Sequence, residues 1–468
     1  NAFSTVGPPC SIEAPMTITQ QLDFGREAAL AGTPCPEPLI RWIETLPVDL
    51  IEIHNKIAES GHGVWVVGGC VRDALLGVLN GDIDLCSTCT PEKVMELFKE
   101  QAIPTGIEFG TVTIKGENQH YELTTLRSEG MYRDGRRPDQ VTWGTSLEED
   151  LSRRDFTFNS MAVDLARRLL YDPFNGTKDM EEHIVRAVGD PMQRCDEDGL
   201  RIFRAYRFLD RGQLGLWNLE GTLHRAMQSK QPILTKVAIE RKWTEFRKIM
   251  MGRNAAEVLN LMIEDGTIQH IMPSLRFISS ELLALFGKHV NDSWLLKHRL
   301  GFLLVEFSRA EVKRTLGDLK LSKSLLNETI RFHRNLGTIP GAHTSSLRVF
   351  RYCLGEDAPL HLEIQGLLYD ESVKVHGQGV LEGNMSEVKH KWSSLDPQQT
   401  PNESLVNGHW IMMRTGVEKG VRLGRLKNWL HRLQIEHDIT EVNGIEQHLS
   451  RIPWQHGDPL KWPQLHFP

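Results

Sequence analysis

The spacing of apolar residues changes once along the chain, near residue 180. Before that point, short apolar runs such as VWVV (64–67) and DIDLC (82–86) alternate with stretches of helical period such as PEKVMELFKE (91–100). Beyond it, apolar residues recur at three- and four-residue spacing, and strand patterns nearly vanish. The change predicts a compact α+β domain that ends near residue 175, followed by a part that is helical throughout.

Two further segments differ from their surroundings in composition. Residues 1–48 are rich in Pro and Gly, and we interpret them as an extension that is partly ordered at best. A break rich in Gly, Ser and Pro at 376–404 separates a last helical piece from the rest. We expect this break to be a linker.

The composition is that of a globular chain long enough for two or more domains, with 468 residues of which 25% are charged. No apolar run approaches the roughly 20 residues of a membrane span, and the first residues lack the layout of a secretion signal. Seven cysteines do not make a disulfide framework in a chain of this length. We therefore expect a cytoplasmic protein with reduced thiols, with an organelle as the open alternative; the oligomeric state stays open.

Basic residues gather in one part of an acidic chain. The formal net charge is −7, yet residues 194–253 contain 13 Lys or Arg against seven Asp or Glu. The overall charge argues against a nucleic-acid coat over the whole surface, but the local excess suits a basic groove. A solvated helix face is the alternative, and charge counting does not choose between the two.

Two aspartates lie two residues apart in the predicted strand GDIDL. Because side chains alternate across a strand, Asp82 and Asp84 share one face while Ile83 and Leu85 point to the core. Two adjacent carboxylates repel each other unless a cation lies between them. Mg²⁺ suits such a pair, since it binds one or two carboxylates together with phosphate oxygens. A solvent-facing turn is the plain alternative, because this pattern is common by chance.

A glycine pair precedes the aspartates. Gly68 and Gly69 end the strand VWVV and lead into a predicted helix, whose first turn carries Arg72. Glycine lets the backbone approach a phosphate, and a helix N-terminus supplies amide donors. The pattern indicates a phosphate cradle next to a metal clamp.

A third carboxylate is a candidate for the same clamp. In YELTTLR (121–127), apolar and polar residues alternate, so Glu122 shares a face with Thr124. If this strand lies beside GDIDL, Glu122 could join the two aspartates. An ordinary surface position is an equal alternative.

Four stretches resemble, in order, the motifs of class II nucleotidyltransferases, the group of CCA-adding tRNA nucleotidyltransferases and bacterial poly(A) polymerases. These stretches are VVGGCVRDALLG…DIDL (66–85), EDLSRRDFTFN (149–159), YDPFNG (171–176) and EDGLRIFRAYRF (197–208). The resemblance implies an N-terminal nucleotidyltransferase head, a small mixed sheet with helices, followed by all-α neck, body and tail domains. The implied segments are an N-terminal extension (1–48), the catalytic head (49–178), a neck for nucleotide selection (179–255), the body (256–375), a linker (376–404) and a tRNA-binding tail (405–468).

The resemblance also implies residue roles. It makes Asp82 and Asp84 catalytic ligands of Mg²⁺, a role that Glu122 would share if it joins them. It implies nucleotide binding by a second set of residues: Gly68, Gly69, Arg72, Arg154, Asp198, Arg201, Arg204 and Arg207. Asp198 and Arg201 would read the base, since a carboxylate accepts from an exocyclic amino group and a guanidinium donates to a ring nitrogen or carbonyl. The stretch 131–138 is similar to a flexible loop needed for the switch to ATP, and its charged residues are Arg133, Asp134, Arg136 and Arg137.

The implied activity is addition of CCA, from CTP and ATP, to the 3′ end of tRNA with release of pyrophosphate. An enzyme that adds only the terminal A and a bacterial-type poly(A) polymerase are the alternatives within the family. A non-catalytic RNA-binding module is the alternative outside it.

Overall fold

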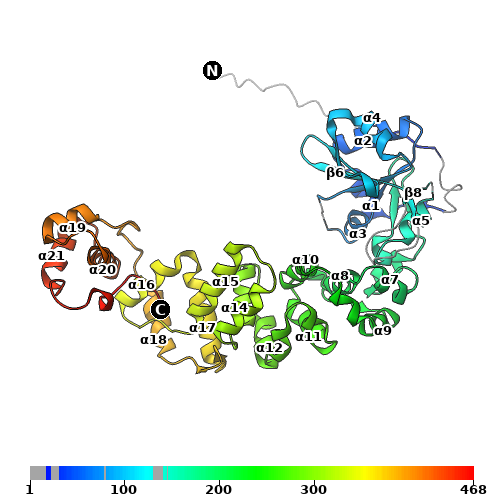
Figure 1. Cartoon of the computed structure of the whole chain (residues 1–468). Helices are drawn as coiled ribbons and strands as arrows, with labels where there is room; N and C mark the ends of the chain where they lie inside the picture. Colours follow the sequence, from blue (N-terminus) through cyan, green and yellow to red (C-terminus); the bar gives the residue numbers. More distant parts are fainter. Residues whose placement is uncertain (1–16, 23–30, 79–80, 130–140, 145) are drawn as a thin grey trace, which may run out of the picture. The chain divides into compact units, whose positions relative to one another are not determined.

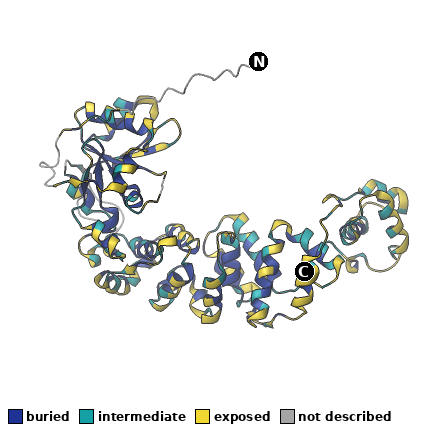
Figure 2. Cartoon of the chain, turned by 180° about the vertical axis from the view of Figure 1, so that it is seen from behind, coloured by how far each residue is buried: buried dark blue, intermediate teal, exposed yellow. Residues whose placement is uncertain are grey.

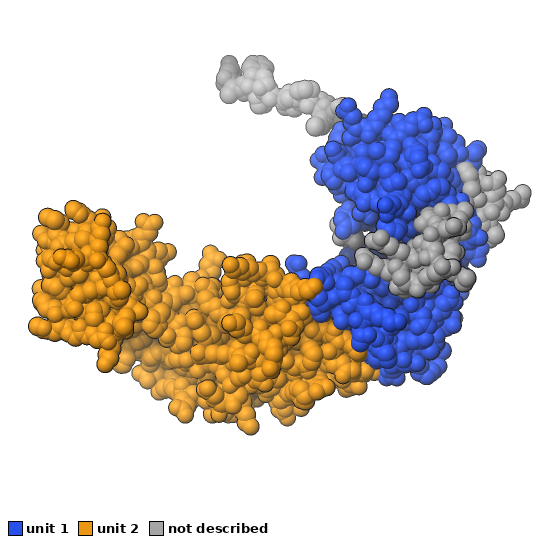
Figure 3. Space-filling view, viewed as in Figure 1, with its two compact units in different colours: residues 1–249 blue, residues 250–468 orange. Residues whose placement is uncertain are grey.

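The computed structural model of the chain describes residues 17–22, 31–78, 81–129, 141–144 and 146–468. The chain forms two compact units, residues 1–249 and residues 250–468 (Figure 3). Within each, the buried residues line the sheet and the packed faces of the helices (Figure 2).

The first unit is built on a mixed sheet of eight strands in the order β1-β10-β9-β2-β3-β6-β5-β4. β3 and β6 run parallel, and every other neighbouring pair in this sheet is antiparallel. The strands are β1 (Thr33–Pro34), β2 (Val64–Val67), β3 (Asp84–Ser87), β4 (Ala102–Gly106), β5 (Thr111–Lys115), β6 (His120–Thr125), β9 (Ala162–Asp164) and β10 (Leu169–Tyr171). The predicted α+β head with a small mixed sheet is confirmed.

Six helices accompany the sheet (Figure 1): α1 (Glu37–Ile43), α2 (Val48–Glu59), α3 (Gly69–Leu75), α4 (Pro91–Phe98), α5 (Leu147–Ser152) and α6 (Gly176–Glu181). Local sequence explains where they begin. The hydroxyl of Thr90 accepts a hydrogen bond from the Lys93 amide, with Pro91 in the first turn, as expected for a helix start. Trp65 and Val67 of β2 pack with Cys86 of β3 in the hydrophobic core.

For residues 33–48, the structure corrects the prediction of an N-terminal extension. β1 pairs with β10 at the edge of the sheet, and the Cys35 amide donates to the Arg168 carbonyl at 2.8 Å. α1 buries Leu39 and Trp42. Pro36 and Pro38, which suggested a loop, lie at the N-terminus of α1, where proline needs no intrahelical partner. This stretch therefore belongs to the head.

Helices and short strand pairs complete the first unit. β7 (Arg127–Glu129) pairs with β8 (Val141–Trp143), and β11 (Ile184–Val185) pairs in parallel with β12 (Asn218–Leu219). The helices are α7 (Pro191–Glu197), α8 (Leu200–Leu209), α9 (Gly221–Ser229) and α10 (Ile239–Met250). On α8, the apolar positions at helical spacing are fully buried, among them Ile202, Phe203 and Tyr206.

The second unit is helical, as predicted. Its α-helices are α11 (Ala255–Glu264), α12 (Ser280–His289), α13 (Leu296–Leu303), α14 (Arg309–Gly317), α15 (Lys323–Leu336), α16 (Thr344–Leu354), α17 (Ala358–Asp370), α18 (Met385–Ser393), α19 (Gly408–Thr415), α20 (Val421–His437) and α21 (Val442–Arg451). A two-residue strand pair, β13 (Lys374–Val375) with β14 (Gly379–Val380), accompanies them. No described helix is long and apolar enough to cross a membrane.

The segment 376–404 is more than the predicted linker. It contains α18, which begins at the side-chain cap Asn384 and places Met385 and Val388 in a core with Leu347 and Phe350 of α16. The flanking glycines, serines and prolines hid this nine-residue helix in the sequence. The other predicted boundaries remain predictions.

Candidate active site

Three carboxylates lie side by side at one edge of strands β3 and β6. Asp84 is the first residue of β3, and Asp82 precedes it by two positions. Glu122 in β6 is the register partner of Asp84 in the parallel pair. All three side chains are exposed, whereas Ile83 and Leu85 are buried. The predicted alternation is thus confirmed, and the structure brings Glu122 beside the two aspartates.

Neighbouring charges shift the pKa of Asp84. Although the Asp84 residue is exposed to solvent, desolvation by the surrounding protein raises the pKa of its carboxyl; Arg154 lowers it, and the negative charges of Glu122 and Asp82 raise it. Carboxylates that disfavour each other's ionisation are the hard oxygen donors that a divalent cation neutralises. The chemistry of these donors therefore suits a hard divalent cation. Among the described residues, however, no group of three or more His, Cys, Asp or Glu side chains is already arranged around one point.

The glycine turn lies next to these carboxylates, because Val67 of β2 is paired with Asp84 of β3 and Gly68 follows Val67 directly. Gly68 has φ 82° and ψ −129°, a conformation that strongly favours glycine. A Cβ atom at this position would lie 2.8 Å from Nη1 of Arg154. Gly68 thus allows the backbone and a guanidinium to meet at the start of α3, where helix amide groups are available to an anion.

Arg72 is held firmly beside this turn. Its Nε donates to Oδ1 of Asp73 at 2.7 Å, and its Nη1 donates to Oδ1 of Asn159 at 2.5 Å. The guanidinium also lies over the ring of Phe208, 5.2 Å from its centroid. A Cβ atom on Gly69 would be 3.6 Å from Nη2 of Arg72, so the guanidinium borders the cradle.

Arg154 approaches the site from the segment after α5. Its Nη2 lies 3.5 Å from Oδ2 of Asp150, a carboxylate that is fully buried and also binds Arg153. Since Arg154 lowers the pKa of Asp84, its charge acts on the carboxylate edge as well as on Gly68. In the structure, Gly68, Gly69, Arg72 and Arg154 therefore lie close together at the N-terminal turn of α3.

Asp198 and Arg201 lie at the junction of α7 and α8. Both oxygens of Asp198 are bound by Arg241 of α10, with Nη2 to Oδ2 at 2.7 Å and Nη1 to Oδ1 at 3.3 Å. Arg201 donates from Nη1 to Oε2 of Glu197 at 2.6 Å and from Nη2 to the Arg153 carbonyl at 3.2 Å. The groups expected to read a base thus bind other protein groups here.

Arg204 and Arg207 continue along α8. Arg204 donates from Nε to Oδ2 of Asp155 at 2.7 Å. Glu245 of α10 lies between the two arginines, with Oε2 at 2.9 Å from Nε of Arg207 and Oε1 at 3.6 Å from Nη1 of Arg204. These two guanidinium groups are therefore fixed by carboxylates from outside α8.

Five residues that bind the predicted site residues were not predicted from the sequence. They are Asp73, Asp155, Asn159, Arg241 and Glu245. Asp73, Asp155 and Asn159 lie inside the quoted motifs, which was an available signal. Arg241 and Glu245 are four residues apart and share a helix face, but only the folded chain shows that this face meets α8. The predicted loop residues Asp134, Arg136 and Arg137 lie outside the described residues.

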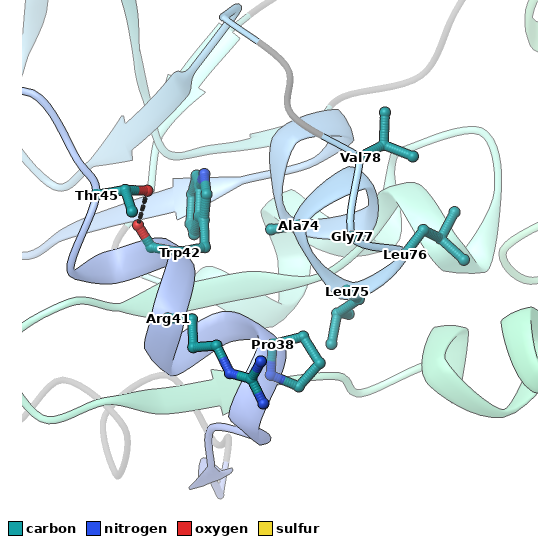
Figure 4. A pocket seen from close by; sticks show the side chains of 9 residues that line it. All are labelled: Pro38, Arg41, Trp42, Thr45, Ala74, Leu75, Leu76, Gly77 and Val78. Carbon is teal, nitrogen blue, oxygen red and sulfur yellow. Dashed lines mark hydrogen bonds between the residues drawn. The ribbon is translucent and has the colours of Figure 1, made fainter.

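A cavity of about 460 Å³ lies at the other end of α3, between that helix and α1 (Figure 4). Trp42 and Arg41 of α1 face Ala74 and Leu75 of α3 across it. None of the predicted site residues lines this cavity. The candidate active site is therefore the open edge of β3 and β6 with the N-terminal turn of α3.

Comparison with known families agrees with these motifs. Residues 64–186 match the family described as "Poly A polymerase head domain". Residues 218–278 match the family described as "Probable RNA and SrmB- binding site of polymerase A". The first match covers the sheet edge, the glycine turn and Arg154, and the second includes α10.

Solved structures and curated relatives extend the match over most of the chain. The fold is similar to the CCA-adding enzyme of Bacillus stearothermophilus in complex with CTP, with TM-score 0.68, 24% identity and coverage of 89% of this chain and 99% of that one. It is also similar to the Thermotoga maritima CCA-adding enzyme complexed with tRNA, with TM-score 0.59, 20% identity and coverage of 88% of this chain and 98% of that one.

The CCA-adding enzyme of Streptococcus gordonii is 33% identical over 397 residues, which are 82% of this chain and 92% of the relative. That of a Geobacillus species is 34% identical over 405 residues, 86% and 94% of the two chains. The chain belongs to the family of CCA-adding enzymes, which are nucleotidyltransferases.

Proposed function

We propose that the protein adds the sequence CCA to the 3′ end of tRNA, taking the nucleotides from CTP and ATP and releasing pyrophosphate. One observation carries this proposal: Asp82, Asp84 and Glu122 lie directly beside the glycine turn and Arg72. An acidic edge next to a phosphate cradle suits attack of a hydroxyl on a nucleoside triphosphate. The relatives named CCA-adding enzyme support the choice of reaction.

Asp82 and Asp84 would hold Mg²⁺, with Glu122 as a third carboxylate. When bound, the cation would lower the pKa of the attacking hydroxyl and neutralise charge on the phosphates. Gly68, Gly69 and the first amide groups of α3 would bind the triphosphate, because a helix N-terminus attracts anions.

Arg72 and Arg154 would add positive charge to the same triphosphate. Arg72 is well suited to this task, since Asp73 and Asn159 fix its orientation before any nucleotide arrives. Such prior order reduces the entropy that binding would otherwise cost.

Asp198 and Arg201 would select the base. A carboxylate accepts from the exocyclic amino group that cytosine and adenine both carry, and a guanidinium donates to a ring nitrogen or carbonyl. In this role, one oxygen of Asp198 would bind the base while the other remains bound to Arg241. Alternatively, Asp198 would release Arg241 and bind the base in its place. Arg204 and Arg207 would support this selection as a fixed positive surface along α8.

The proposal includes the cellular setting. Six described cysteines are free thiols, which fits a reducing compartment such as the cytoplasm. The tRNA would be bound in part through the helical tail, residues 405–468. We propose no oligomeric state.

The decisive experiment uses three tRNA transcripts that end before CCA, after C and after CC. Each is incubated with Mg²⁺ and with labelled CTP, ATP or both, and product lengths are read on a gel. Complete CCA addition predicts that all three transcripts reach the same end. Addition of A only to the CC transcript, or a long A tail, would replace the proposal by one of the two related activities.

Two variants, Asp82→Ala and Asp84→Ala, test the carboxylates in the same assay. Either change should abolish incorporation while tRNA binding persists, because these carboxylates act in the chemistry rather than in gripping RNA. Near-normal incorporation by either variant would remove the carboxylate edge from the mechanism. An inactive wild-type protein that still binds tRNA would instead support the non-catalytic RNA-binding module.

A further inference from the structure

The side chain of Asn159 links two parts of the candidate active site. Its Oδ1 accepts a hydrogen bond from Nη1 of Arg72 at 2.5 Å, and its Nδ2 donates one to Oδ1 of Asp155 at 3.0 Å. The other carboxylate oxygen of Asp155, Oδ2, accepts a hydrogen bond from Nε of Arg204 at 2.7 Å. One amide group therefore connects the arginine beside the glycine turn with an arginine of α8.

The chemistry of its two neighbours fixes the orientation of this amide. A guanidinium only donates hydrogen bonds and an ionised carboxylate only accepts them, so Asn159 must present its oxygen to Arg72 and its nitrogen to Asp155. Burial opposes ionisation of Asp155, but Arg204 and the hydrogen bonds it receives hold its pKa below the ordinary value, so the carboxylate stays ionised. Asn159 is itself buried, which keeps water from competing for either bond.

The ring of Phe208 forms a second connection between the same two arginines. The guanidinium of Arg72 lies 5.2 Å from the ring centroid, and that of Arg204 lies 5.4 Å from it. Each cation is attracted to the electron-rich face of the ring. Arg72 and Arg204 therefore share an aromatic contact as well as the link through Asn159, and a shift of one guanidinium alters the surroundings of the other.

From Arg204 the network continues to the residues proposed to select the base. Oε1 of Glu245 lies 3.6 Å from Nη1 of Arg204, and Glu245 belongs to the same helix as Arg241, which binds Asp198. Burial lowers the pKa of Arg204, but the charges of Asp155, Glu245 and Asp198 outweigh this effect and raise it. The charge of Asp198 thus acts on the arginine to which Asn159 is connected.

We propose that Asn159 is a positioning residue that couples triphosphate binding at Arg72 to base selection near Asp198. The inference rests on the proposed function, which gives Arg72 and Asp198 these roles. Hydrogen bonds in series polarise one another, so a link that is satisfied at both ends strengthens as a whole. A triphosphate bound to Arg72 is then held in a fixed place relative to Arg204, and the base of the same nucleotide meets Asp198 in one geometry.

The test replaces the amide and measures both ends of the link. Asn159→Leu keeps nearly the same size and removes both hydrogen bonds, which leaves a donor of Arg72 and an acceptor of Asp155 without their partner. The first measurement is the Kd of inorganic tripolyphosphate in the presence of Mg²⁺. The second is the preference for CTP over UTP and for ATP over GTP, in kcat/KM, on tRNA transcripts that end before CCA and after CC.

Both quantities should change together. We expect the Kd of tripolyphosphate to rise roughly fivefold and each nucleotide preference to fall roughly tenfold, because loss of a buried hydrogen-bond partner loosens the groups at both ends. Asn159→Ser, whose hydroxyl is too short to bridge Arg72 and Asp155, should show the same two changes. It provides the test if the leucine variant does not fold, which the thermal midpoint of each variant reports.

Ser160→Ala is the matched control. It removes a buried hydrogen bond from the next residue, since the Ser160 hydroxyl donates to the Phe156 carbonyl at 2.9 Å, but this bond involves neither Arg72 nor Asp155. Both quantities should stay within about twofold of wild type, as expected for a change that lowers stability alone.

Three results would overturn the coupling: a change in only one of the two quantities, no change in either, or equal changes in Asn159→Leu and Ser160→Ala. Failure of the proposed function is distinct from these, because the wild-type protein itself would then incorporate neither CTP nor ATP into tRNA.

Discussion

The guanidinium of Arg72 donates hydrogen bonds to neighbouring side chains of the protein. Nε and Nη2 both lie 2.7 Å from Oδ1 of Asp73, and Nη1 is bound to Asn159. Asp73 also lies 3.5 Å from Nη2 of Arg211. Burial, together with the charge of Arg72, lowers the pKa of Arg211 to about 10, so this carboxylate balances two crowded cations.

Asp73→Asn tests whether this carboxylate orients Arg72. The change keeps the size of the side chain and one accepting oxygen but removes the charge between Arg72 and Arg211. We expect the Kd of CTP and of ATP to rise together, each roughly tenfold or about 1.4 kcal/mol, because the triphosphate is common to both. Titration of each nucleotide against the protein measures this.

The control is Asp164→Asn, which alters another buried aspartate, bound by Gln21 and Arg167 in the same unit. It should leave both affinities close to wild type. A rise for only one of the two nucleotides in Asp73→Asn would show that Asp73 acts on base selection instead.

Asp155 makes folding depend on pH. Burial opposes its ionisation, yet Arg204 and the hydrogen bonds from Asn159 and the Phe156 amide hold the pKa of Asp155 below its ordinary value. A carboxylate with a lowered folded pKa stabilises the fold above its unfolded pKa of about 3.9, and this stabilisation is lost as pH falls through the folded pKa. Asp155→Asn should therefore cost about 3 kcal/mol of unfolding free energy at neutral pH.

The pH dependence supplies the check. Urea unfolding at several pH values should show the gap between wild type and Asp155→Asn narrowing below about pH 4. A gap that stays constant to the lowest pH would mean that lost packing, and not lost charge, accounts for the cost.

The sequence predicts which candidate side chains lie on one face better than it predicts their hydrogen-bond partners. The shared face of Asp82 and Asp84 follows from strand alternation, and the position of Glu122 beside them needed only the adjacency of two strands. The partners of Arg72 could not be read in the same way, because Asn159 is 87 residues away in the chain. Such pairs depend on how the elements pack, which local periodicity does not encode.

At the level of elements, α10 binds from outside the residues that we propose select the base. Arg241 binds both oxygens of Asp198, and Glu245, one turn later, binds Arg207 and approaches Arg204. One helix thus binds Asp198, which lies just before α8, and the arginines farther along α8. We infer that α10 sets the geometry in which α8 meets a nucleotide.

Arg241→Ala tests the role of α10. Without its partner, the Asp198 carboxylate should lose its fixed direction, so CTP and ATP should lose their advantage over UTP and GTP by roughly tenfold in kcat/KM. Arg247→Ala removes an exposed charge from the same helix and is the matched control. If both variants discriminate equally well, Arg241 has only a structural role.

Elements were predictable where their apolar period is regular. The helices after residue 180 and the strands of the head follow from period, but β1, α1 and α18 did not. Length alone does not explain this, because the predicted helix α4 has eight residues and the predicted strand β2 has four, whereas α1 has seven and α18 has nine. The apolar residues of α1 and α18 are buried by partners distant in sequence, so composition rich in Pro, Gly and Ser concealed them.

At the scale of the whole molecule, each unit has hydrophobic cores of its own. The first includes the core around Trp65 and Cys86, and the second includes the cores around Phe350 and around Leu430. The candidate active site lies entirely within residues 1–249. Nucleotide binding should therefore stabilise the first unit directly.

Calorimetry of the intact chain tests this division. Without ligand, we expect two unfolding transitions, because units with separate cores need not unfold together. Mg²⁺ and CTP at about 100 times the Kd should stabilise the first unit by about 2.7 kcal/mol and raise the midpoint of one transition only. The variant D82A/D84A should lose most of the shift that depends on Mg²⁺. A single transition that moves as a whole on adding CTP would show that the two units unfold as one, so that nucleotide binding in the first unit stabilises the helices of the second as well.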